Sequence, residues 1–149
     1  MLLKDVLDWL KNEFKYPVPD DYLSFLEKGD FVTTSRKNYI VNLEDENILE
    51  ISEWFNYDNL SLVYNNCLEE EIIEKSHLPI FDSCNCTIVL DCNNENNSYG
   101  CVFSRTPIGH YDETLDKNVY TEFDFVAKSF SKIIENLKTV EELEVMGIL

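Results

Sequence analysis

Residues 86–103 read CTIVLDCNNENNSYGCVF and predict a β-hairpin. Residues 86–91 are a dense run of apolar and β-branched side chains, which is typical of a strand. Residues 91–98 are rich in asparagine and predict a turn, because asparagine tolerates the left-handed backbone conformation. Residues 99–103 then predict the returning strand. This hairpin indicates an antiparallel sheet in the second half of the chain.

Helical patterns come before the hairpin. Apolar side chains at helical spacing from Leu3 to Phe14 predict a first helix, which Pro17 ends because a proline disfavours α-helix in the residue before it. Pro19 and Gly29 bound a second helix, since proline suits a first helical position and glycine a C-terminal cap. Alternating patterns predict strands at 31–34, 39–43 and 48–55, with a short helix as the alternative for the last segment, and a further helix is expected within 58–75.

The pattern after the hairpin becomes helical again. Residues 119–123 are mixed, with Tyr120 as a candidate edge strand, and residues 125–137 predict a helix. Thr139 and Glu142 have the spacing of a capping box before a short last helix that runs through Met146. The order of helices, then strands, then helices predicts a single α+β domain over residues 1–149.

The charge is strongly negative, with 29 acidic and 12 basic residues and a net charge of −17. Nucleic acids and anionic membranes attract cations, so we expect neither as a partner. A positively charged protein is the favoured partner. The carboxylates gather in runs at 44–46, 50–53, 69–74, 112–113 and 141–144. Solvated helix faces and turns explain any one of these runs taken alone.

The five cysteines are an odd number, which does not suit a closed disulfide framework. Asp5 and Asp8 interrupt the apolar segment that an export signal would need. No stretch of the sequence approaches the length of a membrane span. We therefore expect a cytoplasmic protein with free thiols.

Two metal sites can be considered near the hairpin. The candidate zinc ligands are Cys84, Cys86, Cys92, Cys101 and His110. Their spacing does not form the usual paired knuckles, so we expect no zinc. Residues 91–95 offer oxygen ligands at alternate positions, but Asn96 and Val102 stand where a calcium loop has glycine and an acidic residue. We expect neither a metal nor a cofactor.

Catalytic patterns are scarce. His77 and His110 are the two histidines, and neither lies in a known catalytic motif. We interpret His77, just before a Leu-Pro pair, as a loop or capping residue. An enzyme would need a pocket that gathers His110 with Asp112 or Glu113. We expect no enzymatic activity.

Three segments in the same order resemble the SUKH superfamily. Residues 18–26 (VPDDYLSFL) resemble the family's Leu-Pro-x-x-Tyr-x-x-Phe-Leu opening, and residues 78–82 (LPIFD) with the hairpin resemble its central hairpin. Residues 127–134 (AKSFSKII) are similar to its closing helix. The resemblance implies a twisted, mostly antiparallel sheet with helices packed on one side and at the termini. Bacterial members are largely immunity proteins that neutralise toxin domains, often nucleases, and fungal relatives regulate cell-wall synthesis.

We therefore expect an immunity protein that binds a cognate, basic, nuclease-type toxin domain by stoichiometric protein–protein interaction. The alternative is a regulatory adaptor of the same fold with an endogenous partner, and the oligomeric state stays open. The residues expected to supply charge to the partner are Glu44, Asp45, Glu46, Asp91, Asn93, Asn94 and Glu95. The residues expected to supply contact area, near the same sheet edge, are Tyr99, Tyr111 and Asp112.

Overall fold

A computed structural model describes residues 3–28, 39–41, 48–56, 58–84, 86–106, 109–120 and 122–148. Its helices are α1 (Leu3–Trp9), the π-helical turn η1 (Leu10–Phe14), α2 (Asp20–Lys28), α4 (Leu60–Glu69), α5 (Phe130–Glu135) and α6 (Val140–Val145). Its strands are β1 (Tyr39–Val41), β2 (Ile48–Glu50), β3 (Glu53–Trp54), β4 (His77–Ser83), β5 (Cys86–Asp91), β6 (Val102–Arg105), β7 (Gly109–Asp112), β8 (Lys117–Tyr120), β9 (Asp124–Ala127) and β10 (Leu137–Lys138).

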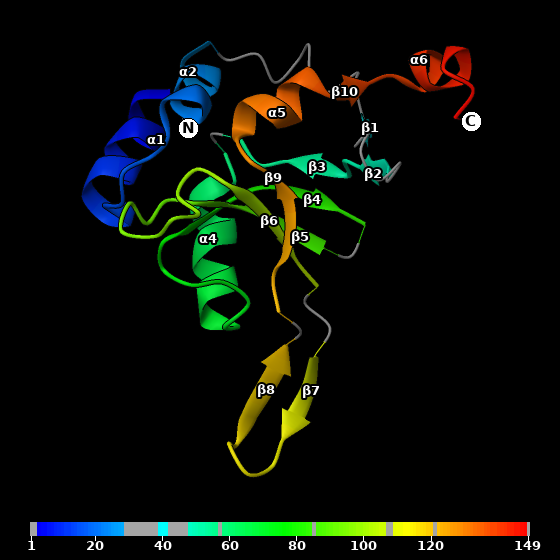
Figure 1. Ribbon diagram of the computed structural model, residues 1–149. Helices are drawn as coiled ribbons and strands as arrows, with labels where there is room; N and C mark the ends of the chain where they lie inside the picture. Colours follow the sequence, from blue (N-terminus) through cyan, green and yellow to red (C-terminus); the bar gives the residue numbers. More distant parts are fainter. Residues whose placement is uncertain are drawn as a thin grey trace.

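The strands form three antiparallel groups. The main sheet has the order β3-β4-β5-β6-β9, a smaller sheet has the order β10-β1-β2, and β7 pairs with β8 as a separate ribbon. Figure 1 shows the ribbon projecting away from the rest of the molecule, with α2 and α5 at the opposite end. The predicted α+β class and the antiparallel hairpin are confirmed, but the returning strand runs over residues 102–105 instead of 99–103.

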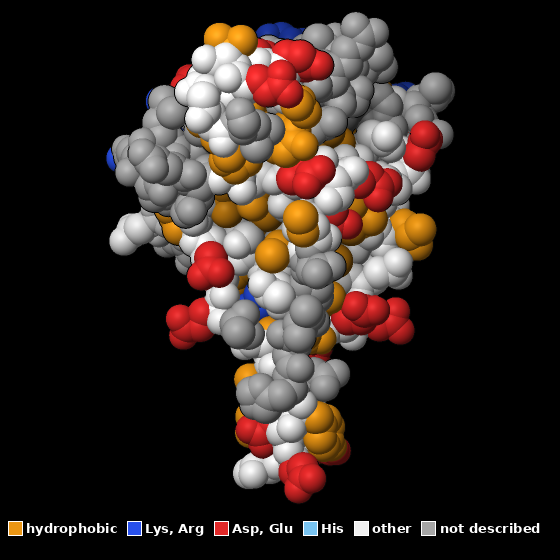
Figure 2. All heavy atoms as spheres, turned by 90° about the vertical axis from the view of Figure 1, so that its right-hand side faces the viewer, with side chains coloured by type: hydrophobic (Ala, Val, Ile, Leu, Met, Phe, Trp, Pro, Cys, Tyr) orange, Lys and Arg blue, Asp and Glu red, His pale blue; other side chains and the backbone are white. Residues whose placement is uncertain are grey.

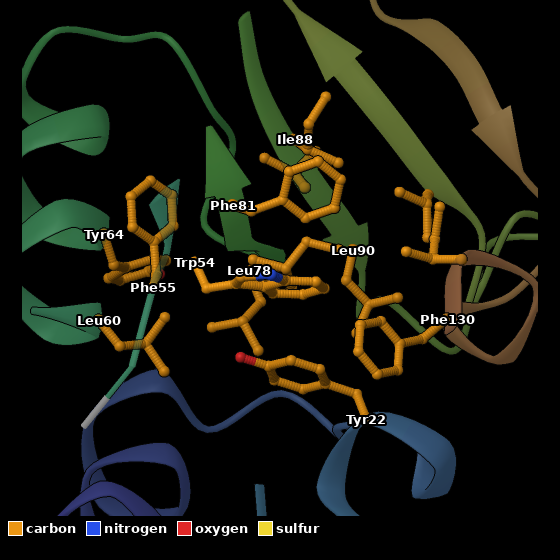
Figure 3. Close-up of a cluster of buried hydrophobic side chains, with 14 of the residues drawn as sticks. Tyr22, Trp54, Phe55, Leu60, Tyr64, Leu78, Phe81, Ile88, Leu90 and Phe130 are labelled. Carbon is orange, nitrogen blue, oxygen red and sulfur yellow. The ribbon is translucent and has the colours of Figure 1, made fainter. Parts of the chain in front are cut away.

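One face of the main sheet carries the hydrophobic core (Figure 3). Trp54 of β3 lies opposite Phe81 of β4, and Phe81 lies opposite Ile88 of β5. The ring of Trp54 packs against Phe81 at 5.0 Å and against Phe25 of α2 at 5.4 Å between centroids. Phe130 of α5 completes this cluster, with its ring 5.0 Å from that of Phe25. Helices α2 and α5 therefore cover this face.

A β-bulge in β4 determines which side chains of this strand point to the opposite face of the sheet. The register shifts between Pro79 and Phe81, so the extra residue, Ile80, is inserted into the strand. Such an insertion reverses the alternation of side chains beyond it. As a result Phe81 points toward the core, and Asp82 points to the opposite face with Thr87, its partner on β5. Helix α4 contributes Leu60 and Tyr64 to the same core (Figure 3), and its Val63 and Cys67 lie at the edge of the sheet on the side of Asp82 and Thr87.

The first helix ends earlier than its proline suggests. Lys15 adopts a left-handed conformation with φ of 69°, and its amide donates a hydrogen bond to the carbonyl oxygen of Leu10 at 2.8 Å. The helix therefore stops at Phe14, and Pro17 lies beyond its end. The second helix matches its prediction, since the Leu23 amide donates to the Pro19 carbonyl at 3.1 Å.

The prediction of a helix over residues 125–137 is wrong for its first part. Residues 124–127 form β9 and pair with β6, with Phe103 opposite Phe125. The helix begins only after Ser129, whose side chain accepts a hydrogen bond from the Lys132 amide. Sheet pairing thus overrides the helical spacing. The capping box at Thr139 is confirmed, and the strand expected at 31–34 lies outside the described residues.

Candidate functional site

A groove lies between α4 and the β3 end of the main sheet. Its volume is about 690 Å³. Its lining comes from β3, α4, β4, β5 and the segments beside them, and consists of Glu53, Phe55, Asn59, Val63, Cys67, Glu70, Ile72, Asp82, Cys84, Cys86 and Thr87. This volume is in the range of pockets that bind small molecules or single side chains of a partner.

A row of polar side chains crosses this face of the sheet. Glu53 lies opposite Asp82, Asp82 opposite Thr87, and Thr87 opposite Arg105. Directly opposed residues of antiparallel strands project to the same face, and neighbouring strands are about 4.8 Å apart. Two carboxylates therefore stand side by side at the β3 end of the row. Arg105 stands at the other end, on β6.

The carboxyl group of Asp82 is in an unfavourable environment for its charge. Burial raises its pKa above the ordinary value of 3.8, and the negative charge of Glu53 raises it further. A hydrogen bond with Thr87 acts in the opposite direction and stabilises the charged form. A cation in the groove would offset both the burial and the repulsion.

The C-terminal end of α4 adds negative charge to the same groove. Glu70 is the C-terminal capping residue of the helix and lines the groove, and the last turn of α4 has no basic side chain. Glu69 and Glu71 flank it in the sequence and are exposed. The C-terminus of a helix carries a partial negative charge, so acidic side chains are destabilising there. The groove therefore attracts positive charge.

Three cysteines, Cys67, Cys84 and Cys86, line the groove. All five cysteines are free in this structure. Burial raises the pKa of Cys67 to about 11, with further contributions from Asp82 and Glu70. The Cys67 thiol is therefore protonated at neutral pH and is a poor nucleophile. Within the described ranges, no cluster of three or more His, Cys, Asp or Glu side chains could hold a metal ion.

Asp91 differs from its expected role. It is 2% exposed, and its carboxylate accepts hydrogen bonds from the Asn93 amide at 2.9 Å and from the Ser98 hydroxyl at 2.5 Å. The Asn96 side-chain amide donates a third at 3.4 Å. Asp91 therefore organises the asparagine-rich loop from within. The expectation that its charge faces a partner is wrong, because a buried carboxylate must be hydrogen-bonded internally.

The rest of that loop divides into an exposed part and an anchored part. Asn94 and Glu95 are exposed, whereas the Asn93 side-chain oxygen accepts a hydrogen bond from the Glu95 amide at 3.1 Å. The Tyr99 hydroxyl donates to the carbonyl oxygen of Pro17 at 3.0 Å. This bond ties the loop to the segment between η1 and α2, where Figure 1 shows it beside the N-terminal helices.

Tyr111 and Asp112 lie far from Tyr99. Tyr99 precedes β6, and Tyr111 follows it, on the projecting ribbon of β7 and β8 (Figure 1). The expectation that these residues share one sheet edge is therefore wrong, since they flank opposite ends of the same strand. Glu44, Asp45 and Glu46 lie outside the described residues.

His77 serves the structure of a turn. Its Nδ1 accepts a hydrogen bond from the Glu74 amide at 3.1 Å, and its ring packs on Phe123 at 4.6 Å between centroids. Burial lowers its pKa below 6.5, with Arg105 acting in the same direction and Glu74 and Asp91 opposing. These contacts agree with the interpretation of His77 as a capping residue. The side chain of His110 lies outside the described residues.

No pattern in the sequence predicts this groove. The acidic runs at 50–53 and 69–74 are separate in the chain, and nothing in the sequence marks Asp82 as a site residue. The pairing of β3 with β4 brings Glu53 beside Asp82, and α4 brings Glu70 to the same groove. No sequence pattern predicts the bulge in this strand, so no local signal marks Asp82.

No family model and no curated protein matches the chain. None of the helices in the described part of the chain has both the length and the apolar character that crossing a bilayer requires.

Proposed function

We propose that this chain is an immunity protein that neutralises a basic, nuclease-type toxin domain by stoichiometric binding, and that the groove between α4 and β3 receives a cationic segment of that toxin. The observation that carries the proposal is the convergence of Glu53, Glu70 and Asp82 on one groove. These residues come from β3, the end of α4 and β4.

Like charges held together in this way destabilise the free protein. Glu53 raises the pKa of Asp82, and Glu70 stands at the negative end of a helix. A Lys or Arg side chain in the groove would convert these repulsions into attractions. The free chain therefore stores an unfavourable interaction that a positively charged partner relieves.

The whole charge of the chain supports the same partner. Because acidic residues outnumber basic ones by 17, most carboxylates have no cation of their own within the chain. A field of this sign speeds the encounter with a basic protein and repels nucleic acid. Nuclease domains are basic because they hold phosphates, so an acidic inhibitor complements them. The resemblance to SUKH immunity proteins supports this assignment over other acidic binding proteins.

The test measures binding to the product of the reading frame next to the gene. The groove variant combines Glu53→Gln, Glu70→Gln and Asp82→Asn, and the control combines Glu27→Gln, Glu141→Gln and Glu144→Gln at exposed positions outside the groove. Both remove the same charge. We expect the groove variant to raise Kd by about 10- to 100-fold, from three ion pairs of about 0.5–1 kcal/mol each. We expect the control to change Kd by less than about threefold.

Three results would overturn the proposal. Equal losses in both variants would mean that diffuse charge, not the groove, carries the binding. Co-expression that leaves cells as sensitive to the neighbouring product as before would exclude immunity. Tight binding to an endogenous regulatory protein, with none to the neighbouring product, would favour the adaptor alternative.

A further inference from the structure

The ribbon formed by β7, β8 and their turn, residues 109–120, projects from the body and is called the arm below. Its strands pair with each other and with no other described strand. Figures 1 and 2 show it extending beyond the main sheet, with acidic and apolar side chains on its surface. A two-stranded ribbon without a packed face is only marginally stable in water. The arm therefore depends on the contacts at its tip and at its root for its stability.

The tip of the arm combines apolar and acidic side chains. Tyr111 is 55% exposed and Leu115 is 58% exposed. Glu113 and Asp116 are also exposed, and Asp112 is half-buried. The tip therefore presents two exposed apolar side chains among carboxylates. Such a surface is complementary to a protein surface that is basic and partly apolar.

Hydrogen bonds within the turn order this tip. One carboxylate oxygen of Asp112 accepts from the amides of Thr114 at 2.9 Å and Leu115 at 3.1 Å. The Tyr111 hydroxyl donates to the carboxylate of Asp116. The backbone of the turn and the ring of Tyr111 are thus held in place before binding, which reduces the entropy lost on association.

The root of the arm is fixed to the rim of the groove. The Tyr120 hydroxyl donates to the carbonyl oxygen of Glu70 at 3.0 Å, and the Arg105 guanidinium lies 4.3 Å from the centroid of Phe123 and 5.5 Å from that of Tyr120. On the other side of the root, the sulfur of Cys86 contacts the hydroxyl of Thr106 at 3.4 Å. Glu70 and Cys86 both line the groove. The arm and the groove are therefore continuous.

We infer that the arm and the groove form one docking surface for a basic protein, in which Tyr111 and Leu115 pack against the partner while the groove carboxylates pair with its Lys or Arg side chains. This inference rests on the proposed function and adds the arm to the site. A second copy of this chain is a poor occupant, because it carries the same net charge of −17. An anionic membrane is disfavoured for the same reason.

The experiment compares two double variants for binding to the product of the neighbouring reading frame. The arm variant is Tyr111→Ser with Leu115→Ser. The control, Leu62→Ser with Val145→Ser, removes two exposed apolar side chains from α4 and α6 (61% and 90% exposed). We expect the arm variant to raise Kd by about tenfold or more, mainly through faster dissociation, and the control by less than about twofold. Neither should change the salt dependence of Kd, because neither changes the charge.

Two further measurements separate contact from folding. Tyr111→Phe keeps the ring and loses the hydrogen bond to Asp116, so it should retain most of the affinity if contact area matters. Amide hydrogen exchange should show that residues 109–120 gain protection in the wild-type complex.

The outcomes distinguish this inference from the proposed function. If the arm variant binds like the wild type while the groove variant does not, the inference is wrong and the proposed function stands. If the wild-type chain does not bind the neighbouring product, both the inference and the proposed function are wrong. If sedimentation shows a wild-type dimer that the arm variant dissociates, a second copy covers the arm and the inference is overturned.

Discussion

His77 and Asp91 are buried polar side chains whose partners are mainly local. His77 accepts a backbone amide from Glu74, and Asp91 holds the asparagine-rich loop by three hydrogen bonds. The two residues face each other across β4 and β5. Buried polar groups are tolerated because they are hydrogen-bonded, and an unsatisfied group would cost about 1–3 kcal/mol. His77 and Asp91 therefore stabilise the fold. The carboxylates of the groove differ from them, because they carry charge that the fold leaves poorly compensated.

His77 predicts a pH dependence of stability. Its folded pKa is below its ordinary value of 6.5, chiefly because of burial, so the unfolded chain takes up the proton at a higher pH. The stabilisation is therefore complete above pH 6.5 and is lost as the pH falls through the lowered folded pKa. We expect the stability advantage of the wild type over His77→Gln to shrink between pH 7.5 and pH 5. Urea titrations at both pH values measure it, and an advantage that grows on acidification would contradict the assignment.

Asp21 links two helices that are far apart in the sequence. Its Oδ2 accepts hydrogen bonds from the Ser131 amide at 2.9 Å and from the Ser131 hydroxyl at 3.0 Å, at the start of α5. Its Oδ1 accepts from the Tyr22 amide at 2.8 Å. A single carboxylate thus caps one helix from another, which favours the arrangement of α2 and α5 over the core.

This link predicts that Asp20 and Asp21, although adjacent, contribute differently to the free energy of unfolding. We expect Asp21→Ala to lower the free energy of unfolding by about 1 kcal/mol or more, because it leaves the Ser131 amide without its acceptor. Asp20→Ala, at an exposed position next to it, is the matched control and should have a smaller effect. Chemical denaturation measures both. Equal losses would show that helix-dipole interactions at the start of α2, rather than the link to α5, account for the effect.

Among the helices and strands, those predicted from residues close in the chain agree with the structure. Pro19 and Gly29 predicted the bounds of α2, the apolar run and the asparagine-rich turn predicted the hairpin, and the spacing of Thr139 and Glu142 predicted their capping box. All three signals depend on residues close in the chain. Residues 125–127 were misassigned to a helix because the pairing of β9 with β6 is a long-range interaction. Local propensity does not indicate which strands will pair in a sheet.

At the scale of the molecule, the excess negative charge opposes folding and favours a basic partner. With a net charge of −17, self-repulsion is distributed over the whole chain. Acidic side chains lie on both the body and the arm in Figure 2. Stability and binding should therefore respond to ionic strength in opposite directions.

Salt provides the test. Raising NaCl from about 20 mM to about 300 mM shortens the screening length to below 10 Å. We expect the Tm of the free chain to rise, because repulsion is screened, and the association rate with the proposed basic partner to fall several-fold. The groove variant, with less negative charge, should gain less in Tm. A flat association rate would mean that the charge plays no part in recognition.

The sequence by itself determined the α+β class, most of the local elements and the sign of the charge, since these follow from composition and short-range periodicity. Only the tertiary structure decided which carboxylates act together. The bulge at Ile80 decides where Asp82 points: in a regular strand it would share the face of Leu78 and enter the apolar core. Because one inserted residue reverses the alternation, Asp82 instead joins Glu53 in the groove.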